Sequence, residues 1–399
     1  MSKDILRRLA TQAPAVQSLD VTLDWDFKST DLTALVDMVA KSNVKVLKLD
    51  LQDDYASNAT IASLRPGKGR YHSLLGLLSN TNLHSLQFSN LYLLGTRTSN
   101  LPSGFSASWL QSFCFYGRIK VEDQSRLSNI ISHCSQLVDL RLVSEGWRYM
   151  GLNLQKAVFS LKMLRRLHLS GWYLGLDLDC IVNEPQPMKE IVYYTALEDS
   201  DLTKIIRQSG PVLEVLVLCS YDETVVDIGP EDPTPIPLLG WEGALAEPLL
   251  YAPRFSALTH LDLSVPLAHP SLQYLSTVLP RLDLVHFGCN TYSLELLQHC
   301  NIASLKSLSI MNANCANLEL LLDTMGDGTA APTWDRLEQL YIGGMTSDTD
   351  VPTHFLQSAQ LTRMYLDQFG RTPLAAALEA VNLSRLQEIY IYYGTYCPD

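Results

Sequence analysis

The chain has 399 residues, of which 47% are hydrophobic and 18% charged, and its 30 Lys and Arg against 42 Asp and Glu give a formal net charge of −12. This balance argues against nucleic-acid binding and against binding to an acidic membrane, because both need positive surface to displace counterions. The acidity fits two interpretations: it only keeps the protein soluble, which is the more common case, or it suits a basic partner.

The N-terminus and the cysteines favour a reducing compartment. The N-terminus has no apolar stretch of signal-peptide length, and no window approaches the ~20 apolar residues of a membrane span. The eight cysteines stand singly without a CxxC pair, which is typical of reduced thiols rather than of a disulfide framework or a zinc site. We expect a cytoplasmic protein, with the nucleus as the alternative location, that holds no metal and no other cofactor.

The first predicted element is an N-terminal capping helix within residues 1–15. From residue 16 onward one template recurs: an aliphatic residue, two others, an aliphatic, one other, and an aliphatic. Fourteen copies follow one another, and ten of the thirteen steps between them lie within the 20–29 residues of a leucine-rich repeat. Their first positions are Val16, Val44, Leu83, Leu110, Leu137, Leu164, Met188, Leu213, Leu258, Leu282, Leu305, Leu337, Leu361 and Leu386.

Each template predicts a short strand, because its second and third apolar positions are two residues apart and share one face. Between the strands, amphipathic stretches with apolar residues spaced by three and four indicate helices, most clearly at 125–134, 152–161 and 318–325. Strands linked in this way must be parallel, with right-handed crossovers. We predict an α/β fold: a leucine-rich-repeat solenoid of about 14 repeats, a curved horseshoe with the parallel sheet on its concave face and the helices on its convex face.

Residues 1–399 are expected to form a single solenoid domain with three interruptions. The largest, at 219–241, is an acidic, proline-rich insertion loop, and the others lie at 53–70 and 326–332. Insertions in solenoids often emerge on the binding face, but drift in a tolerant surface loop explains 219–241 equally well and the other two better. The last strand is followed by six residues, so we expect a longer array or a bare strand edge that pairs.

The repeats resemble the ribonuclease-inhibitor-like class of leucine-rich repeats, including the arrays attached to F-box proteins, over essentially the whole chain. This resemblance implies a protein that binds a partner, most commonly as a substrate-recognition arm in ubiquitin ligation. The chain departs from the class in two ways. The residues ahead of the first repeat do not resemble an F-box, and the asparagine that usually follows each strand is matched well only by Asn290.

The residue between the second and third apolar positions of each strand is expected to point to the concave face. In the last three strands this residue is Tyr341, Tyr365 and Tyr390, and Tyr392 joins them on the final strand. Neighbouring side chains in register stand ~5 Å apart, so the tyrosines form one aromatic ladder. Tyrosine is enriched at binding hot spots, whereas aromatic pairs also stabilise sheets that bind nothing there.

A charged patch is predicted in the first half of the array, where Arg141, Arg166 and His168 lie near Asp139. We assign the two arginines and the histidine to a second partner-binding surface. A solvated polar face is the stronger alternative for this patch.

Motifs for enzymatic chemistry are absent from the sequence: GxSxG, HExxH, GxGxxG and the phosphate-binding loop do not occur. We therefore predict that the chain is not an enzyme but an intracellular protein–protein recognition module that binds its partner on the concave face. The alternative is an inhibitor, or a ligand-sensing arm of a larger receptor, and a hydrolase or transferase is the least supported class. We expect a monomer unless the C-terminal strand edge pairs.

Overall fold

A computed structural model describes residues 15–23, 29–51, 77–89, 101, 105–117, 121–173, 187–194, 209–219, 255–264, 269–290, 293–311, 321, 325, 334–343, 358, 360–367 and 385–392. They fall in two compact units, Met1–Met188 and Lys189–Asp399. Four predicted segments lie largely or wholly outside the described residues: the capping helix at 1–15, the insertion at 219–241, and the interruptions at 53–70 and 326–332.

The first unit contains six described strands that follow chain order, and all its neighbouring pairs are parallel. These strands are β1 (Ser18–Leu23), β2 (Val46–Leu51), β3 (Ser85–Ser89), β4 (Ser112–Gly117), β5 (Asp139–Tyr149) and β6 (Arg166–Tyr173).

The second unit contains eight described strands, also in chain order and parallel. These strands are β7 (Glu190–Tyr194), β8 (Val215–Cys219), β9 (His260–Ser264), β10 (His286–Asn290), β11 (Ser307–Met311), β12 (Gln339–Gly343), β13 (Arg363–Asp367) and β14 (Glu388–Tyr392).

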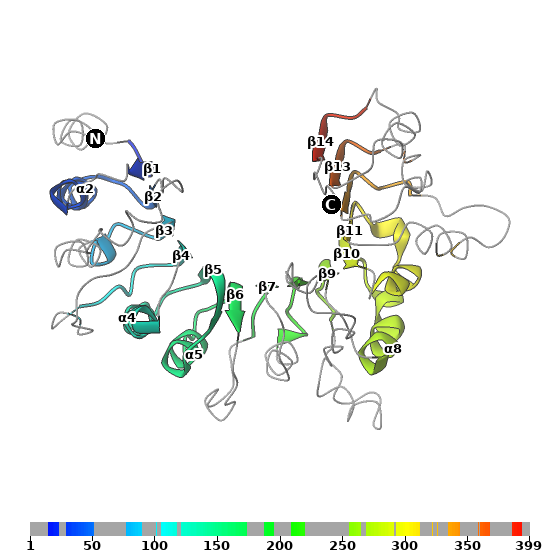
Figure 1. The fold of residues 1–399 in the computed structure, drawn as a ribbon, viewed down its shortest axis with the longest axis horizontal. Helices are drawn as coiled ribbons and strands as arrows, with labels where there is room; N and C mark the ends of the chain where they lie inside the picture. Colours follow the sequence, from blue (N-terminus) through cyan, green and yellow to red (C-terminus); the bar gives the residue numbers. More distant parts are fainter. Residues whose placement is uncertain are drawn as a thin grey trace, which may run out of the picture. The chain divides into compact units, whose positions relative to one another are not determined.

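The described helices lie on one side of the strands in each unit (Figure 1). They are α2 (Ser29–Ala40), α4 (Val121–Ser132) and α5 (Leu152–Phe159) in the first unit, and α8 (His269–Val278) in the second, where three 3-10 turns follow: η4 (Leu279–Arg281), η5 (Leu294–His299) and η6 (Ile302–Ser304). Helices α4 and α5 confirm the helices predicted at 125–134 and 152–161. Only two residues of the stretch 318–325, at 321 and 325, are described, and both are helical.

The core lies between the strands and the helices. In β3, Leu86 and Phe88 at the template positions are buried, while Gln87 between them is partly exposed, because successive side chains of a strand point to opposite faces. Helix α2 buries Leu35 and Val39 in the same way, one helical turn apart. Each repeat thus buries its apolar face against its neighbours. The fold is a leucine-rich-repeat solenoid of the α/β class, as predicted.

All fourteen predicted strands are present, but the frame predicted for the tenth was wrong. The template was placed on Leu282, Val285 and Phe287, whereas Phe287 pairs with Leu261 and Cys289 with Leu263, so the frame is shifted by two residues. The shift preserves which side chains share a face. It moves Asn290 next to the third apolar position, so the predicted asparagine match is lost.

A row of backbone hydrogen bonds marks the start of the strands. The Gln17 carbonyl accepts hydrogen bonds from the N–H groups of both Lys45 and Val46, at 2.8 and 3.0 Å. The Lys45 carbonyl then accepts from the N–H groups of His84 and Ser85, and the pattern continues to Arg166. The second unit repeats it from the Lys189 carbonyl to the N–H groups of Gln387 and Glu388.

Strands β5 and β6 depart from regular pairing near their C-terminal ends. Their register shifts between Val143 and Arg148, and Gly171 of β6 lies at this irregularity with a positive φ of 73°. A Cβ at Gly171 would lie 3.2 Å from the Ser144 carbonyl carbon and closer still to its oxygen. Next to it, the buried Trp172 donates from Nε1 to the Leu142 carbonyl at 3.0 Å, which ties the two strands together.

Candidate functional site

The sheet face opposite the core, called the open face below, carries one side chain per strand between the two apolar positions. In the first unit this row is Asp20, Lys48, Gln87, Cys114, Arg141 and His168, each paired in register with the next. In the second unit the row is Val192, Val217, Asp262, Gly288, Ser309, Tyr341, Tyr365 and Tyr390. Gly288 replaces His286 in the predicted row, since the frame of β10 is shifted.

The three tyrosines of the row lie side by side. The ring centroids of Tyr365 and Tyr390 are 4.7 Å apart and their planes differ by 1°, so these rings are stacked. Tyr341 and Tyr365 are 6.2 Å apart and tilted by 31°. Both distances lie within the range of favourable aromatic pairs. The expected ladder side chains are therefore brought together on three successive strands.

The last tyrosine of the ladder is its most exposed member. Tyr341 and Tyr365 are partly buried, whereas Tyr390 is 55% exposed. The ring of Tyr341 lies over Gly343 of its own strand, where a Cβ would be 2.9 Å from Cε1 of the ring. Tyr392 pairs in register with Asp367 of β13, and its side chain lies outside the described part of the structure.

The predicted charged patch is assembled around one carboxylate. Asp139 is nearly buried and binds Arg141 at 3.3 Å and Arg166 at 3.4 Å, while about half of each arginine side chain remains exposed. His168 pairs in register with Arg141. Burial lowers the pKa of His168 to about 4, an effect that Arg141 reinforces and Asp139 opposes, so the imidazole is neutral at physiological pH.

Sequence reasoning missed a second cluster, formed by Asp262 and two histidines. His260 and His286 occupy the same position of successive strands, and their rings are stacked at 6.1 Å with an interplanar angle of 23°. The signal in the sequence is a histidine directly before the second apolar position of two successive repeats. It becomes visible only when β10 is placed in its correct frame.

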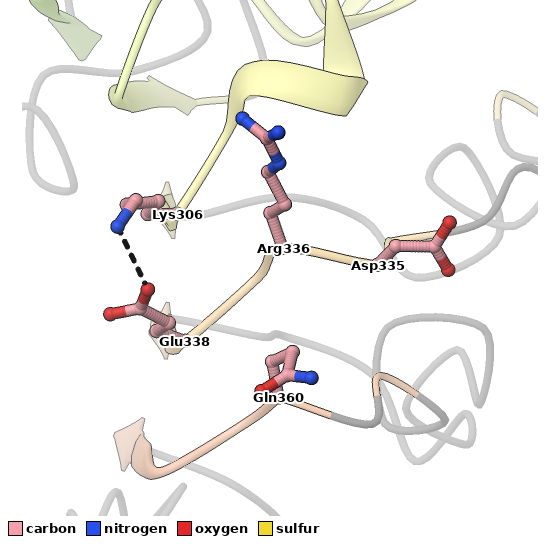
Figure 2. A pocket seen from close by; sticks show the side chains of 5 residues that line it. All are labelled: Lys306, Asp335, Arg336, Glu338 and Gln360. Carbon is pink, nitrogen blue, oxygen red and sulfur yellow. Dashed lines mark ion pairs between the residues drawn. The ribbon is translucent and has the colours of Figure 1, made fainter.

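A depression of about 310 Å³ lies at the N-terminal ends of β12 and β13 (Figure 2). It is lined by Lys306, Asp335, Arg336, Glu338 and Gln360, and Lys306 binds Glu338 at 3.1 Å. Two cations and two carboxylates therefore balance there. A second depression, of about 590 Å³, lies over α4 and α5 and is lined mainly by serine and asparagine side chains with Lys156. Neither contains histidine or cysteine among its lining residues.

The sequence matches no protein-family model, and no curated protein is similar to it. Among solved structures, the chain is similar to a leucine-rich-repeat protein of Leptospira interrogans, with 14% sequence identity and a TM-score of 0.32. That similarity covers 93% of this chain and 88% of the other. The fold assignment rests on the repeated strand register and burial described above.

Two further properties concern the described residues alone. None of their helices combines the length and the apolar character that a membrane crossing requires. They also contain no group of three or more His, Cys, Asp or Glu arranged to hold a metal ion. Leucine-rich-repeat solenoids typically act as binding scaffolds, since stacked repeats present an extended surface to a protein partner.

Proposed function

We propose that this chain is an intracellular protein–protein recognition module that binds its partner on the open, concave face of the sheet. The proposed contact residues are Tyr341, Tyr365, Tyr390 and Tyr392. The observation that carries this proposal is the row of three tyrosines in register, with two rings stacked at 4.7 Å. Stacking holds the rings in place before binding, so less side-chain entropy is lost when a partner arrives.

The exposure of Tyr390 supports recognition over a purely structural role. A ring that only stabilised the sheet would gain most from burial, yet Tyr390 is 55% exposed at the end of the row. Tyrosine offers a large apolar area and a hydroxyl that can donate or accept a hydrogen bond, which suits the centre of an interface.

Arg141, Arg166 and His168 are proposed as a second contact surface. The two arginines share the Asp139 carboxylate, and about half of each side chain is exposed to a partner's carboxylate or carbonyl groups. Neutral His168 adds a polar contact without a third positive charge. The arrangement favours an acidic or polar segment of the partner over this patch.

The resemblance to ribonuclease-inhibitor-like repeats gives the proposed context, a substrate-recognition arm in ubiquitin ligation. An inhibitor or ligand-sensing receptor arm with a basic target is the second candidate, favoured by the net charge of −12. In either context we propose a monomeric, cytoplasmic or nuclear protein without a cofactor. We further propose one domain over 1–399, with a capping helix at 1–15 and an insertion at 219–241, because the repeat spacing continues through residue 188.

The test is co-purification of partners from the native cell with the wild-type chain and with a Tyr341→Ala, Tyr365→Ala, Tyr390→Ala variant. Truncation of one hot-spot tyrosine costs ~2 kcal/mol or more, so the triple variant is expected to lose the partner. The matched control is Tyr149→Ala, which removes an exposed tyrosine of the first unit and leaves the ladder intact. The variant must retain the native melting transition.

Equal capture by the folded triple variant and the wild type would refute the role of the tyrosines. With the captured partner purified, the salt dependence of binding separates the two contexts. A basic target predicts binding that weakens steeply with salt, whereas a tyrosine-centred site predicts little change.

A further inference from the structure

The carboxylate of Asp262, on the open face of the second unit, is held with one oxygen satisfied and the other free. Oδ1 accepts hydrogen bonds from the Ser264 hydroxyl at 2.8 Å, the Ser264 N–H at 3.2 Å and the Cys219 thiol at 3.6 Å. Oδ2 lies over Gly288, where a Cβ would come within 2.5 Å of it. No described residue donates a hydrogen bond or a cation to Oδ2.

Three other carboxylates of the second unit are each paired with a lysine or arginine of the neighbouring repeat. Glu214 binds Lys189 at 2.6 Å, Glu338 binds Lys306 at 3.1 Å (Figure 2), and Glu388 binds Arg363 at 3.3 Å. Asp262 has no such partner among the described residues. Its three hydrogen bonds fix the carboxylate, so Oδ2 presents a negative charge in a defined position.

Two histidines lie beside this carboxylate. His286 is bound through Nδ1 to the Ser307 hydroxyl at 2.9 Å, and His260 through Nδ1 to the Thr259 hydroxyl at 2.8 Å. Burial lowers the pKa of His286, the neighbouring His260 lowers it further, and Asp262 opposes both effects. His286 is therefore neutral at pH 7.5, and the Asp262 charge is not cancelled there.

The row next to Asp262 also leaves room for an incoming side chain. Gly288 and Ser309 are the two residues between Asp262 and Tyr341, and both are small. With ~4.8 Å between neighbouring strands, the stretch of small side chains from the Asp262 carboxylate to the Tyr341 ring is on the order of 14 Å long. An extended arginine or lysine can lie across it with its charged end at Oδ2.

We propose that Asp262, with His260 and His286 beside it, is a pH-dependent site for an arginine or lysine side chain of the protein partner. This site rests on the proposed function and adds the partner's chemistry: a basic residue placed three strands from the tyrosine ladder. Below its own pKa, His286 takes up a proton and becomes an internal cation beside Asp262. It then repels and replaces the external cation, so binding weakens in acid.

The other groups around His286 do not supply this competition. On β9, His286 faces His260 and Asp262. On the β11 side it faces the neutral Ser307, and Lys306, directly before Ser307, forms an ion pair with Glu338. Beyond β9, Cys219 of β8 contacts the same carboxylate as a thiol whose pKa is raised by burial, so it stays uncharged.

The test uses N-acetyl-arginine amide, a blocked arginine, as the probe and needs no partner. With histidine labelled at the ring carbon between the two nitrogens, NMR follows the His260 and His286 signals while the probe is added at pH 7.5. We expect saturable shifts of these signals in the wild type and their loss in Asp262→Asn, which is isosteric and keeps an oxygen for Ser264 and Cys219. Asp283→Asn, which removes the same charge from an exposed site elsewhere, is expected to bind like the wild type.

A pH titration of the same signals tests the competition. Because the probe and the proton exclude each other, saturating probe must move the His286 midpoint to lower pH, and His286→Gln must remove the acid-induced loss of probe binding. The proposal would be overturned if the probe shifted the histidine signals of Asp262→Asn as much as those of the wild type. It would also be overturned if the titration midpoint of His286 were the same with and without the probe. Either result leaves the tyrosine test untouched, and this test can succeed even if the tyrosines prove structural.

Discussion

Replacing Gly171 by alanine tests whether the irregularity between β5 and β6 depends on a residue without a side chain. Gly171 has a φ of 73°, and an added Cβ would press against the backbone carbonyl of Ser144. Backbone cannot rotate away as a side chain can. The left-handed conformation costs a non-glycine residue ~1–2 kcal/mol, and relief of the overpacking costs typically ~1–3 kcal/mol. Together these predict a loss of about 3 kcal/mol in the stability of the first unit.

The matched control is Gly151→Ala, at the N-cap of α5. Gly151 has a φ of −62°, which alanine adopts without strain. The nearest obstacle, at 2.9 Å, is Oε1 at the end of the buried Gln124 side chain, which accepts a hydrogen bond from the Gly151 N–H and would have to shift slightly. Loss of the glycine N-cap and the gain from a stiffer unfolded chain are each within ~1 kcal/mol and have opposite signs. The control is therefore expected to lose clearly less stability than Gly171→Ala.

Amide hydrogen exchange read by mass spectrometry measures these effects locally, which suits a solenoid whose repeats need not unfold together. About 3 kcal/mol corresponds to roughly 100-fold faster exchange in the peptides that contain β5 and β6, at ~1.4 kcal/mol per factor of ten. Exchange in Gly171→Ala within threefold of the wild type would refute the reasoning. So would an equal acceleration in Gly151→Ala.

Two further predictions follow from buried titratable groups. Since the pKa of His168 falls from 6.5 to about 4 on folding, the unfolded chain binds a proton that the folded chain does not. Acidification from pH 6.5 to about 4 should therefore lower the first unit's free energy of unfolding, by at most ~3 kcal/mol at ~1.4 kcal/mol per pH unit. Urea titrations measure this free energy, and an equal loss on acidification in His168→Asn and the wild type would argue against the prediction. Burial raises the pKa of the Cys134 thiol to about 12 and also raises that of the Cys289 thiol. Iodoacetamide at pH 8 should therefore alkylate these two cysteines only in denaturant. Peptide mapping that finds either of them alkylated in the folded protein would contradict this prediction.

The strands were predictable because the buried residues of a leucine-rich repeat recur at a fixed spacing in the sequence. Leu140 and Leu142, for example, are two residues apart and both buried, with Arg141 exposed between them. Periodicity of this kind decides which side chains share a face, and so it also located the tyrosine row and the patch on Asp139. Both were assembled as expected, although their binding roles remain predictions.

The error at β10 has a physical cause. The segment from Leu282 to Cys289 has apolar residues at the template spacing in two frames, and the later frame ends on a cysteine, which is not an aliphatic residue. The structure uses the later frame, in which Leu284, Phe287 and Cys289 are all buried, while Leu282 packs directly after the η4 turn. The Asp262 cluster was missed for the same reason, because Gly288 and His286 exchange roles when the frame moves.

The direction in which the Asp262 carboxylate points was beyond the reach of sequence. It depends on three donors from two strands, Ser264 on its own strand and Cys219 on β8, and on the missing side chain at Gly288. A pattern of residue types records which positions are neighbours. It does not record which oxygen of a carboxylate is satisfied.

The row of backbone hydrogen bonds at the strand starts has a consequence for how such a chain can change over evolutionary time. Every junction within a unit uses the same carbonyl acceptor and the same two backbone N–H donors, and a side chain adds to them only where the Thr259 and Thr362 hydroxyls also donate to the Glu214 and Glu338 carbonyls. The row therefore accepts residues as different as Gln17, His84 and Val138. A repeat can be duplicated or deleted without a new solution at its borders, and these positions remain open to selection by whatever the protein binds.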